Sequence, residues 1–352
     1  TATTADGESV SETVVVTIEG AEDAPENLVV DGDELSNFLT AGGGDDIIRS
    51  FEGSDTLVGG EGNDTLEGGE GNDVGVFAGP QTAYTLTLGK GVTTLSDRRA
   101  AEDGGQGLDQ ISGLEFLDFG TEIDIFDGGS MHLDIFDGPT TLSAEDFDDI
   151  IELYIAYFNR APDALGLYYW ATEFANGFSI LEMAQSFFVQ PETQATYASV
   201  LDDSGNLDIS NASKVGDFVH AIYNNVLGRE PDGPGFDYWV NQLQNVPEIT
   251  PAAFIYAFIG GAKFPSEPTI QTGIDQEYLA TKSDLGAYFS VIKGMSDVED
   301  AKASMLLFDG SESSIAASLE AIDEHYADAL DPVTGDFLMP LVGVIADPFE
   351  MI

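Results

Sequence analysis

The chain has 352 residues and a formal net charge of −53, because 64 Asp and Glu residues face only 11 Lys and Arg residues. Hydrophobic residues make up 43% of it, too many for a disordered acidic tail. Phosphate binding needs a Lys and Arg surface, so the composition argues against a nucleic-acid partner and favours a cation. Cys is absent, which excludes disulfides, thiolate metal sites and Cys nucleophiles.

The segment 1–25 shows no signal peptide and indicates the interior of a larger protein. Residues 10–18 alternate and are rich in Val and Thr, which predicts a β-strand. The acidic segment 20–25 follows and ends in proline. This pair resembles the last strand and linker of the cadherin-like repeats of bacterial surface proteins, whose linkers often hold calcium. An ordinary solvated acidic turn explains the same residues equally well.

Residues 32–76 contain a nine-residue repeat. Glycine-rich turns occupy 32–37, 41–46, 50–55, 59–64 and 68–73, and each ends in Asn or Asp. A glycine-rich hexapeptide can form a tight turn, and the next three residues form a short strand with one aliphatic side chain inward. The inward positions are Leu39, Ile48, Leu57 and Leu66, whereas the fifth repeat has Gly75 there.

Two repeats complete one coil, so alternate turns stack at the strand spacing of about 4.8 Å. Two carboxylates at that distance repel by roughly 4 kcal/mol at an effective dielectric of 20. One aliphatic side chain per repeat buries little surface, so we expect the stack not to fold alone. Calcium between stacked turns would remove the repulsion, since it prefers carboxylate and carbonyl oxygens. A glycine-rich acidic linker is the alternative.

The nonapeptide G-G-x-G-x-D-x-U-x, with U a large aliphatic residue, resembles the calcium-binding repeat of RTX (repeats-in-toxin) proteins. The resemblance implies a short parallel β-roll that binds Ca²⁺ between turns 41–46 and 59–64 and between turns 50–55 and 68–73. Turn 32–37 would add a weaker site with turn 50–55, because its Asn brings no charge. The side chains and turn carbonyls implied as ligands belong to Asn37, Gly42, Gly44, Asp46, Phe51, Gly53, Asp55, Gly59, Glu61, Asp64, Gly68, Glu70 and Asp73.

Residues 77–140 are β-rich, and a hairpin is predicted over 84–95. An isolated nonapeptide follows at 104–112, and 113–119 is similar to a segment that follows RTX repeats. We expect it to extend the roll. Asp109 would then be an extra calcium ligand that caps the column ending at Asp73, with Ile111 continuing the ladder of Leu57 and Leu66; a flexible loop is the alternative. Asp-Ile-Phe-Asp-Gly occurs at 124–128 and 134–138, which we interpret as strands and turns, with metal binding as the less favoured reading.

From residue 140 the apolar period changes from two to about 3.6, which predicts helices to about residue 330. Ser143 is the expected first cap, and later helices are expected at 283–293, 297–307 and 312–329. The sequence R-x-P-D-x-x-G-x-x-Y-W occurs at 160–170 and again at 229–239. This signature resembles a helical domain of unknown function found in RTX and surface-layer proteins.

We interpret the signature mainly as structural. Pro and Asp would begin a helix, glycine would allow close backbone approach, and Tyr and Trp would supply core. Arg160 and Arg229 are expected to pair with Asp163 and Asp232. A sugar-binding groove is the alternative for the aromatic residues. The segment 202–208 is either a cation-binding loop or a plain one.

The sequence therefore predicts an α+β multidomain protein, a short parallel β-roll with a β-rich extension followed by an all-α domain. The domains are 1–25, 26–140, 141–265 and 266–352, the last including an apolar, acidic end that fits a type I secretion signal. We expect no enzyme, because no H-E-x-x-H, G-x-S-x-G or P-loop is present and the three His are scattered.

The expected function is that of the calcium-binding C-terminal region of a large secreted RTX protein, exported by the type I route. It would attach to a cell-surface or extracellular protein or glycan. A surface-layer lattice subunit is the first alternative. The non-catalytic end of a secreted hydrolase is the second.

Overall fold

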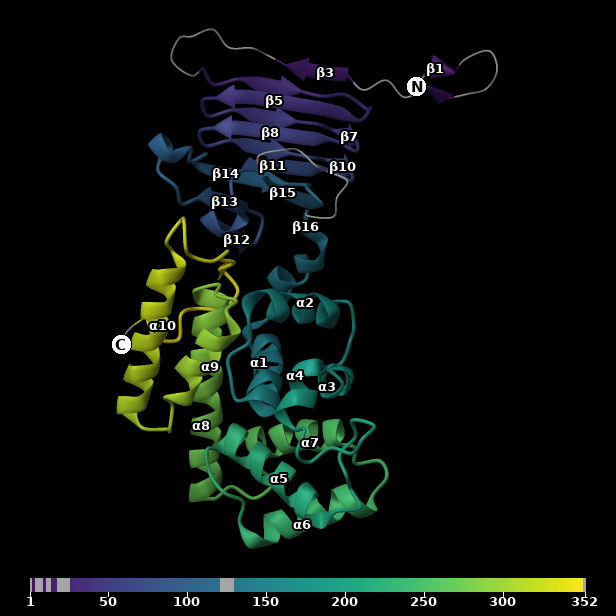
Figure 1. Cartoon of the computed structure of the whole chain (residues 1–352), viewed down its shortest axis with the longest axis vertical. Helices are drawn as coiled ribbons and strands as arrows, with labels where there is room; N and C mark the ends of the chain where they lie inside the picture. Colours follow the sequence, from purple (N-terminus) through teal and green to yellow (C-terminus); the bar gives the residue numbers. More distant parts are fainter. Residues whose placement is uncertain (1, 4–8, 11–13, 18–25, 121–129, 351–352) are drawn as a thin grey trace. The chain divides into compact units, whose positions relative to one another are not determined.

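The computed structural model describes residues 2–3, 9–10, 14–17, 26–120 and 130–350. The chain forms two compact units, which are described separately (Figure 1). The first comprises residues 1–140 with 327–343 and contains nearly all the strands. The second comprises residues 141–326 with 344–352 and is helical. The predicted α+β class is confirmed.

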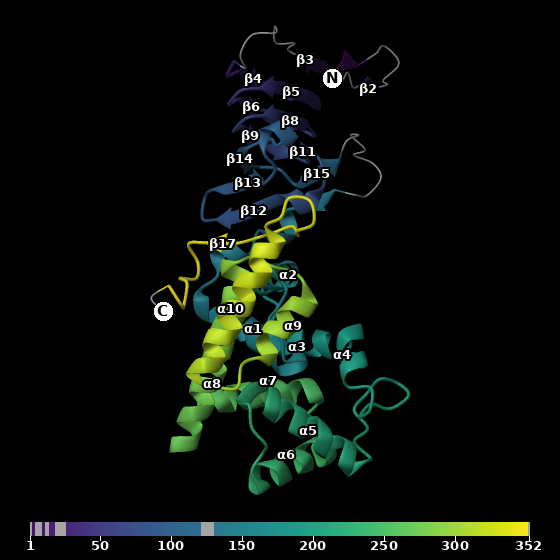
Figure 2. The same ribbon diagram turned by 60° about the vertical axis from the view of Figure 1, so that its left-hand side comes forward.

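The first unit contains two mainly parallel sheets, whose strands alternate along the repeats (Figures 1 and 2). A six-stranded sheet runs in the order β16 (Met131–His132), β15 (Phe116–Gly120), β11 (Val74–Ala78), β8 (Thr56–Glu61), β5 (Asn37–Gly43) and β3 (Val14–Thr17). A seven-stranded sheet runs in the order β17 (Leu341–Val342), β12 (Tyr84–Gly89), β13 (Thr93–Asp97), β14 (Leu108–Ser112), β9 (Thr65–Glu67), β6 (Ile47–Arg49) and β4 (Val29–Asp31). Two short pairs add β1 (Ala2–Thr3) with β2 (Ser9–Val10), and β7 (Glu52–Gly53) with β10 (Glu70–Gly71).

Residues 26–120 form what we call the repeat stack, in which a strand of one repeat pairs with the strand two repeats further along the chain. Leu39 pairs with Leu57 in one sheet, and Ile48 pairs with Leu66 in the other. All four side chains are fully buried, as the spacing predicted. Gly75 leaves a gap in the first ladder, and Leu114 fills it, because a Cβ on Gly75 would lie 2.8 Å from Leu114 Cδ1.

The isolated nonapeptide joins the stack, as expected. β14 pairs in parallel with β9, which places Ile111 beside Leu66. Leu57 is not in that ladder, because it belongs to the other sheet, where Leu117 of β15 continues the column beyond Gly75. The predicted hairpin forms as β12 and β13, which connect the stack to the isolated turn.

Two parts of the first unit differ from the expected division. β3 pairs in parallel with β5 and so extends the six-stranded sheet, while the linker 20–25 and the segment 124–128 lie outside the described residues. The second Asp-Ile-Phe-Asp-Gly segment forms a 3-10 turn at Asp134–Phe136.

Near the other end of the chain, β17 pairs with β12 (Figure 2). Residues 327–343 therefore belong with the strands, although the sequence grouped them with the last helices.

The helical unit begins at α1 (Ala144–Phe158), where Ser143 and Asp146 form a capping box, as predicted for Ser143. The unit contains two copies of one arrangement, which follow one another along the chain. The first copy is α1, α2 (Ala164–Ala175), α3 (Ile180–Phe188) and α4 (Pro191–Thr196). The second is α5 (Ala212–Leu227), α6 (Gly233–Asn245), α7 (Pro251–Lys263) and α8 (Ile270–Ala287).

Helix α8 starts earlier than the predicted segment 283–293, because Thr269 caps it, and it continues into a π-helical turn at Tyr288–Ile292. The last helices, α9 (Val298–Leu306) and α10 (Glu312–Ala329), lie where they were expected. Within the described residues, no helix is long and apolar enough to cross a membrane.

Candidate metal centre

The repeat stack carries two columns of buried carboxylates, one along each sheet. In the first column, Asp46, Asp64 and Asp109 follow one another. The Asp64 Oδ1 accepts the Asp46 backbone N–H at 2.9 Å, and the Asp109 Oδ1 accepts that of Asp64 at 2.8 Å. These carboxylates are at most 3% exposed. Asp109 therefore lies one level beyond Asp64, as proposed for a column cap, but in the column of Asp64 and not that of Asp73.

The second column holds Asp55 and Asp73 and ends on a residue that the sequence did not single out. The Asp73 Oδ1 accepts the Asp55 N–H at 2.8 Å, and the Glu115 Oε2 accepts the Asp73 N–H at 2.7 Å. Glu115 thus occupies the place that Asp109 has in the first column. The sequence could have indicated Glu115 through its position, because it lies three residues after Ser112 in the segment similar to the one that follows RTX repeats.

Each aspartate uses one oxygen in this ladder and leaves the other unused. Among the residues that the structure describes, the Oδ2 atoms of Asp46, Asp55, Asp64 and Asp73 are buried and have no hydrogen-bond partner. A buried carboxylate oxygen without a partner is costly. Four such atoms at equivalent places in successive turns fit a cation as the missing partner.

Glycines make room for these oxygens. A Cβ on Gly59 would lie 2.2 Å from the Asp64 Oδ2, and one on Gly68 would lie 2.9 Å from the Asp73 Oδ2. Left-handed backbone at Gly42, Gly44 and Gly53 turns the chain, with φ of 122°, 121° and 135°. The first glycine of the repeat is thus needed because the carboxylate five residues later fills the place of its side chain.

Four further candidates, Phe51, Glu61, Glu70 and Asn37, have different surroundings. The Phe51 carbonyl accepts the Glu70 N–H at 2.7 Å, and the Glu61 carbonyl accepts the Gly44 N–H at 2.9 Å. Their own side chains and that of Glu70 are exposed. Asn37 is already partnered, because its Oδ1 accepts the Asp33 N–H at 2.9 Å and its Nδ2 donates to the Asp33 Oδ1. The roles of these residues as ligands stay predictions.

Burial sets the electrostatics of the columns. It raises the pKa of Asp64 and of Asp73 from 3.8 to about 6, and that of Asp109 to about 7, and neighbouring carboxylates add to the shift. Within the described ranges, no group of three or more acidic or His side chains gathers as a metal cluster. A cation between two turns would therefore depend on the backbone as well as on carboxylates.

One column ends beside a cation that the chain itself supplies. β13 lies next to β14, and Asp97 in it is fully buried as a side chain. The Arg99 Nη2 lies 2.6 Å from the Asp97 Oδ2. Asp97 is thus a buried carboxylate of the first unit that is neutralised by a side chain, Arg99, and it needs no metal ion.

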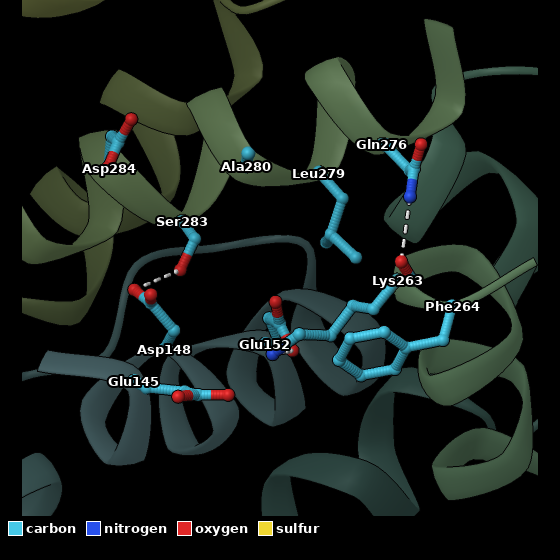
Figure 3. Close-up of a pocket in the computed structure, with 10 residues that line it drawn as sticks. All are labelled: Glu145, Asp148, Glu152, Lys263, Phe264, Gln276, Leu279, Ala280, Ser283 and Asp284. Carbon is cyan, nitrogen blue, oxygen red and sulfur yellow. Dashed lines mark hydrogen bonds and ion pairs between the residues drawn. The ribbon is translucent and has the colours of Figure 1, made fainter. Parts of the chain in front are cut away.

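The helical unit holds a second acidic region, a cavity of about 340 Å³ shown in Figure 3. Glu152 in its wall is 3% exposed, and the Lys263 Nζ lies 3.0 Å from it and 2.6 Å from Asp149. Burial raises the pKa of Glu152 to about 7 despite that lysine. Ser283 donates to Asp148 across the cavity. The ion pair with Lys263 accounts for the burial of the Glu152 carboxylate. Nothing in the sequence indicated this pair.

The loop 202–208 resembles a plain turn more than a cation site. The Asp202 Oδ1 accepts the backbone N–H groups of Ser204 and Asn206. Asp208 pairs with Lys214 at 3.2 Å. Both carboxylates are therefore satisfied by the chain.

The doubled signature is accounted for almost completely, with one correction. Asp163 and Asp232 cap α2 and α6 through Gly166 N and Gly235 N, as expected of a helix start. The bidentate partner of Arg160 is Glu192, and that of Arg229 is Asp275, at 2.7–2.8 Å. The expected pair does form in the first copy, where the Arg160 Nη1 lies 3.6 Å from the Asp163 Oδ2. The closer, bidentate partners Glu192 and Asp275 were not named from the sequence, and Asp163 and Asp232 also serve as helix caps.

Comparisons with known proteins match two parts of the chain. The family model described as RTX calcium-binding nonapeptide repeat (4 copies) matches residues 31–66 and 49–75. The one described as Domain of unknown function (DUF4214) matches residues 206–262, within the second helical copy. No curated protein and no solved structure matches the chain. The chain thus carries RTX calcium-binding repeats, which are typical of secreted proteins, and the RTX part of the expected resemblance is confirmed.

Proposed function

We propose that residues 26–120 form a calcium β-roll in a secreted surface protein, which folds on calcium outside the cell and serves attachment. The observation that carries this proposal is the set of buried, unpartnered Oδ2 atoms in the repeat stack. Their carboxylates would hold the ion together with turn carbonyls, and the bound Ca²⁺ would supply the positive charge that these turns lack.

Export is consistent with the same feature. Cytosolic calcium is scarce, and a stack of unneutralised carboxylates is then unstable, so the segment would stay unfolded and able to pass through a secretion channel. Folding after export would hinder its return. Type I export and attachment are inferred here from the kinship of the repeats with RTX proteins.

We further infer that the chain acts by binding and not by catalysis. His132, His220 and His325 lie apart, and each pairs with a different carboxylate. None of them forms part of a nucleophile and base arrangement in the described part of the chain. A surface-layer lattice would use the same calcium chemistry, and assembly into sheets on adding calcium would favour it over attachment by a monomer.

The test compares two substitutions in one turn. Asp64→Asn removes a buried charge and keeps a similar shape, whereas Glu61→Gln removes an exposed charge three residues earlier. Calorimetric titration of the whole chain should give fewer bound calcium ions for Asp64→Asn and the parent number for Glu61→Gln. In chelator, Asp64→Asn should be no less stable than the parent, because it removes a buried charge without a partner. Equal losses for the two variants would contradict a specific site.

A further inference from the structure

The two copies of the helical repeat each carry an aromatic cavity at the same place. The first has a volume of about 450 Å³ and lies between α1, α2, α3 and the start of α4. The second has a volume of about 220 Å³ and lies between α5, α6, α7 and α8. Tyr, Arg and Trp line both at equivalent positions of the two copies: Tyr154, Arg160 and Trp170, and Tyr223, Arg229 and Trp239.

The arginines of these cavities are fully engaged by the protein. Arg160 is 3% exposed, its Nε and Nη2 bind Glu192, its Nη1 donates to the Ala161 carbonyl, and it lies over Tyr154 at 5.1 Å. Arg229 repeats this with Asp275, the Glu230 carbonyl and Tyr223. A carboxylate or phosphate ligand would find no available guanidinium, and the net charge of −53 would repel it.

The glycines of the signature are also explained. A Cβ on Gly166 would lie 2.7 Å from the Tyr154 hydroxyl, and one on Gly235 would lie 2.6 Å from the Tyr223 hydroxyl. Arg, Asp and Gly therefore all have a structural role. The burial of the signature's other residues does not explain the tyrosine before each tryptophan, because that tyrosine is exposed.

These tyrosines are exposed although they were expected in the core. Tyr169 is 43% exposed and Tyr238 is 55% exposed. Each packs edge-on against its half-buried tryptophan, with ring centroids 5.2 and 4.9 Å apart. Tyr169 itself lines the first cavity, whereas Tyr238 touches the second only through Trp239. An exposed aromatic pair beside hydrogen-bonding groups, present twice, is the arrangement expected of a binding site for a ligand with one apolar face and a polar rim.

We propose that each cavity binds a neutral saccharide ring of a surface glycan. In the first cavity the ring's C–H face would stack on Tyr169 and Trp170, and its hydroxyls would donate to the Glu192 carboxylate, whose side chain is 39% exposed. In the second it would stack on Trp239. Two sites in one chain allow weak single contacts to give useful avidity on a surface. The inference deepens the proposed attachment and rests on it for its biological role, but the sites themselves lie in the helical unit and need no calcium.

The chain offers a direct readout, because its two tryptophans lie one in each cavity. The whole chain with calcium is titrated with methyl α-mannoside, methyl β-galactoside, N-acetylglucosamine and cellobiose while tryptophan emission is followed. Glucuronate and N-acetylneuraminate serve as anionic probes. We expect a saturable change with at least one neutral sugar, at millimolar concentration, and none with the anions. Trp170→Phe and Trp239→Phe each leave one reporter and separate the cavities.

The tyrosines provide the matched variants. Tyr169→Ala should weaken binding at the first cavity by about tenfold, as expected for the loss of one stacking contact. Tyr238→Ala should weaken binding at the second cavity less, because Tyr238 acts there only by packing on Trp239. Tyr256→Ala is the control, because Tyr256 is 48% exposed on α7, lines neither cavity and, in the described part of the chain, has no ring contact with a tryptophan such as Tyr169 and Tyr238 have. Circular dichroism checks that the helices remain.

The proposal is overturned if none of these sugars gives a saturable change, if the anions bind as well as the neutral sugars, or if Tyr256→Ala has the same effect as the other two. The outcomes that contradict saccharide binding differ from those that contradict calcium-dependent attachment. Calcium-dependent attachment to cells that Tyr169→Ala and Tyr238→Ala leave intact would overturn the saccharide sites alone. Sugar binding that persists in chelator, in a chain that attaches to no surface, would support the sites and contradict the attachment.

Discussion

The two units bury carboxylates in opposite ways. In the helical unit, Glu152 lies beside Lys263, and Asp275 is held by Arg229. In the two carboxylate columns of the repeat stack, the buried aspartates bond to backbone N–H groups and pair with no Lys or Arg side chain, unlike Asp97 next to them. Of the 11 Lys and Arg residues, only Arg49, Lys90, Arg98 and Arg99 belong to the first unit. The helical unit supplies Lys and Arg side chains as counterions for its buried carboxylates, whereas the carboxylate columns of the first unit need a cation from solution.

Removal of calcium should produce the largest difference in stability between the two units. With EGTA in excess, the repeat stack should lose its protection from protease and from amide hydrogen exchange, because its buried charges then repel one another. The helices should keep their circular dichroism signal, since their core needs no metal. If both signals were lost together, the division into a calcium-dependent and a calcium-independent unit would be wrong.

Breaking an internal ion pair should have the next largest effect, and in the other unit. Lys263→Met leaves Glu152 buried without its partner, which typically costs about 3–5 kcal/mol. The loss should appear as a lower unfolding midpoint of the helices at any calcium concentration. Lys302→Met is the control, because Lys302 is exposed. Rescue of Lys263→Met by calcium would contradict the comparison.

Acid should partly replace calcium in the repeat stack. Burial raises the folded pKa of Asp64 and Asp73 from 3.8 to about 6 and that of Asp109 to about 7. A folded pKa above the unfolded value means that protonation stabilises the folded state. This stabilisation is complete below about pH 4 and is lost as the pH rises through 6 to 7. In chelator, protease protection should therefore increase on lowering the pH from 7.5 to 5, and calcium affinity should fall over the same range.

The smallest effect is expected at the start of the helical unit. Ser143 accepts the Asp146 N–H and completes a capping box. Ser143→Ala should lower the free energy of unfolding of this unit by about 1 kcal/mol, measured by urea denaturation in chelator. Ser313→Ala, an exposed position within α10, is the comparison and should change it less. No change at Ser143 would mean that α1 is fixed by packing alone.

The sequence predicted what depends on local spacing. The nine-residue period specified which turns stack and which aliphatic side chains are buried, because register in a parallel stack follows from repeat length. It also placed Asp163 and Asp232 at helix starts. Long-range partners were not predictable in this way. Glu192 and Asp275 were missed because they lie on helices remote in sequence from the arginines that they bind, and the place of Glu115 depends on a chain that leaves the stack and returns.

The strand β17 has a consequence for the order of folding. Leu341 pairs with Leu88, and the Arg98 Nη2 donates to the Asp336 carbonyl at 2.6 Å, so the seven-stranded sheet is completed by residues from the far end of the chain. The long loop adds little to the entropy cost, about 0.6 kcal/mol for each doubling of its length, but contacts so remote form late. During synthesis, the outer edge of β12 has no partner until residue 342 has emerged. A chain interrupted before residue 341 would keep that edge open and able to pair with another molecule, so β17 protects the edge of the seven-stranded sheet against pairing between molecules.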